Sequence, residues 1–99
     1  MSDLNEQQKK FLRGLAHPKE PVARTGQAGL TESLLTEIAA QLLAHELIKL
    51  KVSAPDREAR DALISEVCAK TGATLVQRIG NVAILYKRHP TKPKIELPK

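Results

Sequence analysis

Residues 31–52, TESLLTEIAAQLLAHELIKLKV, contain the two most regular patterns of the chain, one directly after the other. Within 34–43, apolar residues recur every three or four positions, which predicts a helix from the N-cap Thr31 to about His45. Over 47–52 apolar residues and lysines alternate, which predicts a strand with one buried face. A helix followed by such a strand is the unit from which layered α/β domains are built.

The flanking segments extend this unit to the order αβαβαββ. The predicted elements are helix 6–16, strand 21–25, helix 31–45, strand 47–52, helix 53–70, strand 75–79 and strand 82–86. His17-Pro18 ends the first helix, Ser53 is the expected cap of the third, and Gly80-Asn81 is a two-residue hairpin turn. Helices between single strands imply parallel crossovers, so we expect one compact α/β domain with three helices and a mixed four-stranded sheet.

The composition restricts what the core and the surface can be. The chain has 99 residues, of which 41% are hydrophobic, but it has one Phe, one Tyr and no Trp. The core must therefore be aliphatic, and a surface of stacked aromatic rings is nearly excluded. We expect Phe11, which belongs to the apolar stripe of the first helix, to lie in the core.

The positive charge is concentrated at the C-terminus. Sixteen Lys and Arg against eleven Asp and Glu give a net charge of +5, which favours an anionic partner. Residues 87–99 contain five of those cations and one acid, so the rest of the chain is almost neutral. Because Pro90, Pro93 and Pro98 interrupt this segment, we expect a domain over 1–88 and a flexible basic tail over 89–99. Its deletion should leave stability nearly unchanged.

The sequence offers no set of residues for catalysis. Its three histidines are dispersed, Cys68 is the only cysteine, and the glycines fit no nucleotide-hydrolysing P-loop. No run of 18 apolar residues indicates a membrane span, and the polar N-terminus does not resemble a signal peptide. We expect a cytoplasmic, monomeric binding protein with no metal, cofactor, small-molecule substrate or membrane partner.

The most informative motif is the loop Gly26-Gln27-Ala28-Gly29, which lies between a predicted strand and a helix. Two glycines let the backbone approach a phosphate, and the helix N-terminus offers unpaired N–H groups. A G-x-x-G loop clamps nucleic-acid backbones in KH domains, although a plain turn explains the same four residues. The predicted RNA-binding residues are Gly26, Gln27, Ala28, Gly29, Arg24, Thr31, Lys49, Lys51, Lys9, Lys10 and Arg13.

A longer series of motifs resembles one known family. They are Gln8-x-x-Phe11-Leu12-Arg13-Gly14-Leu15-Ala16-His17, Val22 to Arg24 with Gly26 to Glu32, His45 to Lys51, Gly72-Ala73, Val76 to Gly80, and Leu85-Tyr86. In this combination and order they resemble the YhbY-type, or CRM-domain, RNA-binding proteins. The loop departs from the pattern, because Gln27-Ala28 supplies no cation where relatives often carry Lys.

This resemblance implies a stand-alone bacterial domain that associates with precursors of the large ribosomal subunit, with 23S rRNA as its partner. It also implies a fold similar to the C-terminal domain of translation initiation factor three, with the G-x-x-G loop on the RNA surface. Two alternatives stay open. One is an RNA chaperone or a group II intron splicing factor, and the other is a protein-interaction adaptor with a basic tail.

Overall fold

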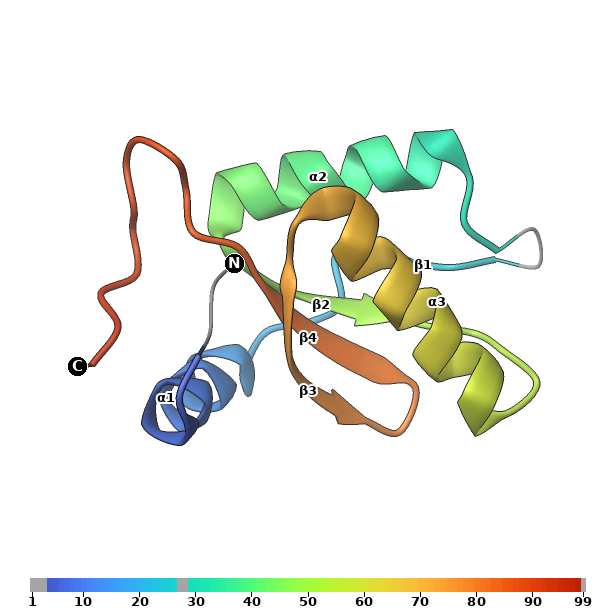
Figure 1. Cartoon of the computed structure of the whole chain (residues 1–99), viewed down its shortest axis with the longest axis horizontal. Coiled ribbons are helices and arrows are strands. Elements are labelled where there is room, and N and C mark those ends of the chain that lie inside the picture. The colour runs from blue at the N-terminus through green and yellow to red at the C-terminus, as the bar shows by residue number, and fades with distance from the viewer. Residues whose placement is uncertain (1–3, 27–28, 99) are drawn as a thin grey trace.

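The computed structural model describes residues 4–26 and 29–98, and over these residues it contains three helices and four strands in the predicted order. The elements are α1 (Glu6–Ala16), β1 (Ala23–Arg24), α2 (Glu32–His45), β2 (Leu47–Lys51), α3 (Arg57–Thr71), β3 (Thr74–Ile79) and β4 (Val82–Tyr86). Figure 1 shows their arrangement, with β2 and β4 at the centre.

The four strands form one mixed sheet in the order β1-β2-β4-β3. β1 and β2 are parallel and joined by α2, while β4 is antiparallel to both β2 and β3. The predicted hairpin turn is confirmed, because Gly80 has φ 60 between β3 and β4, a value that glycine adopts without strain. The predicted mixed α/β sheet is therefore correct.

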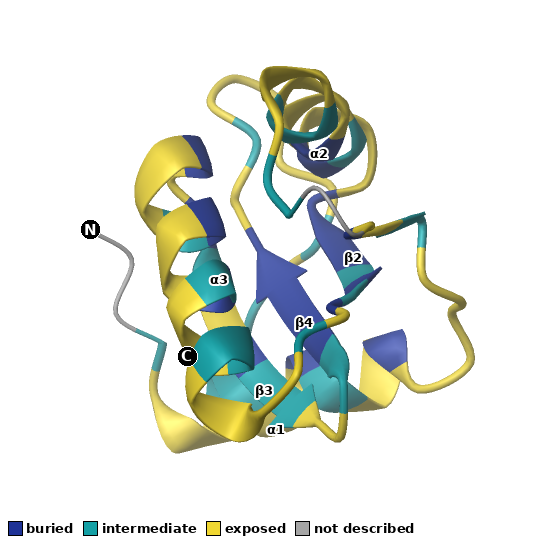
Figure 2. Cartoon of the chain, turned by 90° about the vertical axis from the view of Figure 1, so that its right-hand side faces the viewer, coloured by how far each residue is buried: buried dark blue, intermediate teal, exposed yellow. Residues whose placement is uncertain are grey.

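Each face of the sheet is covered by a different apolar cluster. On one face, α2 and α3 pack against side chains such as Ile48, Leu50 and Leu85. On the other face, Leu12 and Ala16 of α1 pack against residues of β2, β3 and β4. Figure 2 shows that α2 and α3 turn their buried faces toward β2 and β4. The sheet is thus the middle of three layers.

Local capping fixes where the helices begin. Asn5 and Gln8 form a capping box at α1, and the Thr31 hydroxyl accepts a hydrogen bond from the Leu34 N–H at α2. The predicted cap and start of the third helix were wrong. The cap is Asp56 and not Ser53, so α3 begins at Arg57, and the Asp56 carboxylate accepts the Ala59 N–H at 2.9 Å. Ser53 lies three residues earlier, in the connection from β2.

The prediction that Phe11 lies in the core was also wrong. Its exposed fraction is 39%, and that of Leu15 is 38%. The residues of α1 that are fully buried are Leu12 and Ala16, one turn apart. The apolar stripe of α1 is wider than the part of it that contacts the sheet. Phe11 and Leu15 lie at the edge of the stripe, outside that contact.

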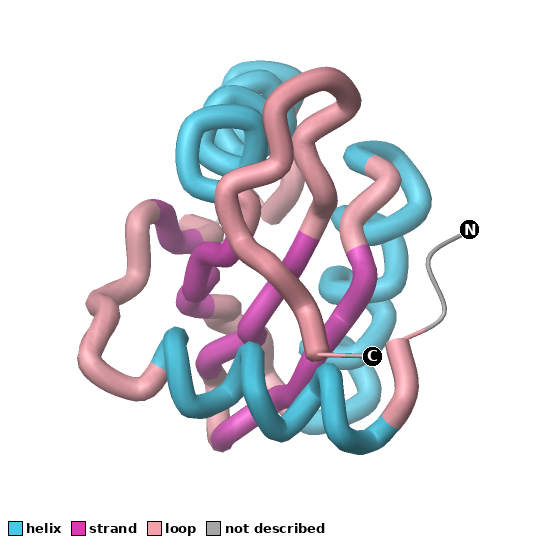
Figure 3. Tube along the Cα trace, turned by 90° about the vertical axis from the view of Figure 1, so that its left-hand side faces the viewer, coloured by secondary structure: helices cyan, strands magenta, loops and turns pink. Residues whose placement is uncertain are grey.

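The C-terminal segment differs from the free tail that its composition predicts. Residues 89–98 run from β4 past the end of α2 to α1, as Figure 3 shows. Ile95 and Leu97 pack against the cluster under α1, and the Gln8 side-chain amide donates to the Pro98 carbonyl at 3.0 Å. The segment therefore covers part of the sheet face that α1 leaves open.

Glu46 holds this segment in place. It follows α2, has φ 64, and is fully buried. Its carboxylate accepts the backbone N–H groups of His89, Lys94 and Ile95 at 2.8, 2.6 and 2.8 Å. Burial raises the pKa of this carboxyl, but the three N–H donors and the charge of His89 outweigh burial, so the pKa lies below its usual 4.5.

Candidate nucleic-acid interface

The predicted loop lies between β1 and α2 at one end of the molecule. The Gly29 N–H donates to the Gly26 carbonyl at 3.0 Å, which closes the loop at its base. Gly29 has φ 72, so this position favours glycine. Gln27 and Ala28 lie outside the described residues, and their predicted contact with RNA stays a prediction.

The first turn of α2 has N–H groups that can donate hydrogen bonds to an anion. Thr31 caps this helix, and its hydroxyl is bonded to the Leu34 N–H at 3.1 Å. Among the described residues, no group accepts the N–H of Glu32 or Ser33. These two donors point out of the helix end next to Gly29, as expected for a helix N-terminus.

Two predicted cations meet on one face of the sheet. β1 and β2 are in register so that Arg24 pairs with Lys51, while the preceding pair is Ala23 and Leu50. Since Leu50 is fully buried under α2 and α3, alternation places Arg24 and Lys51 on the opposite face. Neither cation has an ion-pair or hydrogen-bond partner for its side chain among residues 4–26 and 29–98.

Lys49 lies on that same face, two residues before Lys51 in β2. Its ammonium donates to the carbonyl of His17 at 3.2 Å, at the C-terminal end of α1. This carbonyl belongs to the negative end of the helix dipole, which a cation stabilises. Lys49 thus contributes to the docking of α1 as well as to the surface charge.

The structure separates the remaining predicted cations from the loop. Lys9, Lys10 and Arg13 all lie on α1. Figure 1 shows α1 and the loop at opposite ends of the long dimension of the molecule, which measures 38 Å. The predicted set therefore forms two groups, with Lys49 between them, and no single phosphate can contact both.

Several other cations are engaged with the protein itself. Lys87 donates to the Thr71 carbonyl, Lys94 donates to the Ala44 carbonyl, and Arg78 pairs with Asp61 at 2.9 Å. Two of these three, Lys87 and Lys94, belong to residues 87–99, which carry most of the net charge. Part of that charge therefore stabilises the fold.

Beside the loop there is a hollow of about 640 Å³ that the sequence did not predict. It is lined by Thr25, Gly26, Gly29, Ser53, Ala54, Pro55, Ala59 and Leu63. These residues come from the loop, the connection between β2 and α3, and the first half of α3. Spacing along the chain gives no signal for it, because it forms only when three separate segments pack together.

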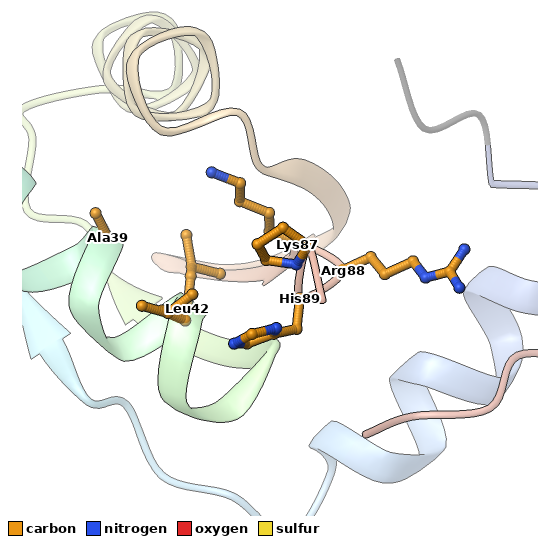
Figure 4. A pocket seen from close by; sticks show the side chains of 7 residues that line it. Ala39, Leu42, Lys87, Arg88 and His89 are labelled. Atoms are coloured by element: carbon orange, nitrogen blue, oxygen red, sulfur yellow. The ribbon is translucent and has the colours of Figure 1, made fainter. Parts of the chain in front are cut away.

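A smaller hollow of about 240 Å³ lies between α2 and the start of the C-terminal segment (Figure 4). Arg88 extends away from it, while the His89 ring lies at its edge near Leu42. The His89 Nδ1 atom already accepts the N–H groups of Thr91 and Lys92. This histidine therefore shapes a turn of the chain.

The rest of the described chain shows no sign of a metal or membrane site. Across residues 4–26 and 29–98 no group of three His, Cys, Asp or Glu side chains could hold a metal ion. None of the helices in these ranges is long and apolar enough to cross a membrane. Burial raises the pKa of the Cys68 thiol, which makes it a poor nucleophile.

Comparison with known proteins identifies the family. The sequence pattern of the CRS1/YhbY (CRM) domain matches residues 4–87, which include the loop, Arg24, Lys49, Lys51 and α1. The chain belongs to the CRS1/YhbY (CRM) domain family. The predicted resemblance is therefore confirmed.

Individual relatives agree with this assignment. An "RNA-binding protein" of Haemophilus influenzae is 46% identical over 99 residues, which cover 100% of this chain and 99% of the relative. A "probable RNA-binding protein" of Pseudomonas aeruginosa is 40% identical over 92% of this chain and 88% of its own length. The solution structure of a hypothetical protein from Staphylococcus aureus superimposes with a TM-score of 0.83 at 32% identity, covering 97% of this CRM chain and 100% of the other.

Proposed function

We propose that this CRM protein binds RNA without catalysis and acts in the cytoplasm as a monomer on precursors of the large ribosomal subunit. The partner would be 23S rRNA, as the family resemblance implies, and the names of the curated relatives support RNA binding in general. The proposal rests chiefly on the loop. Gly29 lies just before two N–H groups of α2 that have no acceptor among the described residues, and Arg24, which pairs with Lys51, lies two residues before Gly26.

In this mechanism the loop and the cations have different tasks. A phosphate approaches the exposed N–H groups of Glu32 and Ser33, where the helix dipole favours negative charge. Arg24 and Lys51 neutralise neighbouring phosphates of the same strand and release counterions. Lys9, Lys10 and Arg13 on α1 contact a more distant part of the RNA. Such contacts fix position and do not read bases.

An acidic loop tests this mechanism directly. The variant with Gln27→Glu and Ala28→Glu places like charge where a phosphate must approach, so affinity for precursor 23S rRNA should fall at least about tenfold, or about 1.4 kcal/mol. Fluorescence anisotropy measures affinity, and circular dichroism checks the fold. The control carries Ser65→Glu and Ala69→Glu, which add the same charge at exposed positions of α3 and should change affinity far less. Wild-type affinity in the acidic loop variant would refute the role of the loop.

The cellular role needs a separate experiment. Tagged protein should sediment with precursors of the large subunit, and crosslinked RNA from cells should be enriched in 23S rRNA. An RNA chaperone or an intron splicing factor would use the same loop but bind a spread of other transcripts. An adaptor that docks a protein through its basic tail would bind RNA weakly, and the acidic loop would not matter.

A further inference from the structure

The hollow beside the loop has the size of a ligand site but no charge of its own. Its volume of about 640 Å³ falls in the range of roughly 300–1,000 Å³ that small-molecule sites occupy. The lining residues are uncharged, and most offer methyl groups, methylenes or a proline ring. Such walls do not suit a phosphate. They suit a flat and largely apolar group with polar edges.

One wall contains a glycine that the fold of this chain does not require. Gly29 needs its positive φ of 72, but Gly26 lies outside that region of φ. A Cβ atom at Gly26 would meet no described atom within 4 Å. The missing side chain therefore leaves space for something outside the chain to approach the backbone closely.

The Thr25 side chain joins two of the segments that line the hollow. The Thr25 hydroxyl accepts the Ser53 N–H at 2.8 Å, and Thr25 itself is buried. Within the described residues, the Ser53 hydroxyl forms no hydrogen bond, and Ser53 is exposed. A hydrogen-bonding group is therefore available at the rim of an apolar cavity whose walls are already fixed.

This hollow and the cations Arg24 and Lys51 lie on opposite faces of the sheet. Leu63 packs with the cluster under α2 and α3, whereas Arg24 and Lys51 lie on the other face of the sheet. An RNA strand that follows the loop could therefore put its phosphates on the side of Arg24 and Lys51 and turn a base to the side of Leu63.

We propose that the hollow binds one unpaired nucleotide of the RNA whose backbone the loop holds. This inference rests on the proposed function and adds a preference for single-stranded or bulged RNA. The apolar walls at Ala54, Pro55 and Leu63 contact the base, and Ser53 bonds to its edge or to the 2′-hydroxyl. A base that is paired inside an A-form helix cannot enter, because its faces are stacked and its edge is occupied.

Filling the hollow tests the proposal. Ala59→Leu adds three carbons to the wall near the start of α3, and Ala62→Leu makes the same change at an exposed position of the same helix. The probes are a fluorescein-labelled single-stranded RNA of twelve mixed nucleotides and the duplex made from it. We expect Ala59→Leu to weaken binding of the single strand at least tenfold while the affinity for the duplex stays within twofold. Ala62→Leu should change neither affinity.

Gly26→Ala provides a second test with a smaller side chain. It fits the fold, since nothing lies within 4 Å of the added Cβ, and it should weaken binding of the single strand in the same direction as Ala59→Leu. If both variants bind the single strand at wild-type strength, or lose the single strand and the duplex equally, the hollow is not a nucleotide site. Either result leaves the acidic loop experiment valid. Failure of the wild-type protein to bind any RNA would instead refute the proposed function.

Discussion

The two ends of the molecule differ in how well the local sequence predicts their structure. At one end, the loop motif is recognised from four consecutive residues, and a backbone hydrogen bond from the Gly29 N–H to the Gly26 carbonyl closes its base. At the other end, residues 89–98 have the composition of a free tail, but a buried carboxylate and two apolar side chains attach them to the body. The residue that holds the tail is Glu46, between 43 and 49 positions away.

This contrast follows from what each end contacts. The N–H groups of Glu32 and Ser33, just after the loop, are available to a partner because no group among residues 4–26 and 29–98 accepts them. The C-terminal segment fills an open part of the sheet face beside α1, where Ile95 and Leu97 leave water. Exposed charge on the same segment does not oppose docking, because Lys94 itself donates to the Ala44 carbonyl. Charge and proline content therefore predict poorly whether a terminal segment docks.

Removing the segment should give the largest effect on stability. Deletion of residues 89–99 exposes the apolar surface under Ile95 and Leu97, at about 1 kcal/mol or more for each half-buried side chain. It also leaves Glu46 without its three donors. Thermal unfolding should shift downward by at least about 10 °C, given roughly 4–8 °C per kcal/mol for a chain of this size. A shift of only a few degrees would favour the free tail that composition predicts.

As the pH falls, the C-terminal segment should detach before the rest of the fold unfolds. The pKa of Glu46 is lowered in the folded protein, so its ionised form contributes stability above about pH 4.5, and this contribution is lost as the pH falls through the lowered pKa. The protection factors of the His89, Lys94 and Ile95 amides against hydrogen exchange should fall over that range, while those of the β2 and β4 amides stay high. Glu46→Gln serves as the control. It keeps an acceptor but cannot ionise, so the protection factors of these amides should be lower at neutral pH and should show no acid step.

Local patterns predicted the elements well because their causes are local. The bounds of α1, the Thr31 cap and the Gly80 turn each depend on residues within four positions. The errors arose where two local signals competed or where packing decided. Ser53 and Asp56 are both good N-caps, and the structure uses Asp56. Phe11 and Leu12 are both apolar, but the sheet covers Leu12 alone of the two.

The candidate site was predictable in its parts and not in its arrangement. The loop and the outward direction of Lys49 and Lys51 follow from spacing and alternation. The pairing of Arg24 with Lys51 depends on the register of β1 against β2, which no local pattern specifies. The distance of α1 from the loop and the hollow at Ala59 depend on how whole elements pack.

The smallest expected effects separate cations that bind RNA from cations that hold the fold. Lys51 has no described partner, so Lys51→Ala should weaken RNA binding and reduce the slope of log affinity against log salt by roughly 0.7–0.9, with stability unchanged. Lys49 is bonded to the His17 carbonyl, so Lys49→Ala should lower stability by up to about 1 kcal/mol, because α1 loses a cation at its C-terminal end. Urea unfolding and salt titrations of RNA binding measure the two effects. Equal losses of stability in both variants would show that the hydrogen bond to His17 does not distinguish the two lysines. An unchanged salt slope for Lys51→Ala would show that the RNA phosphates bind away from β2.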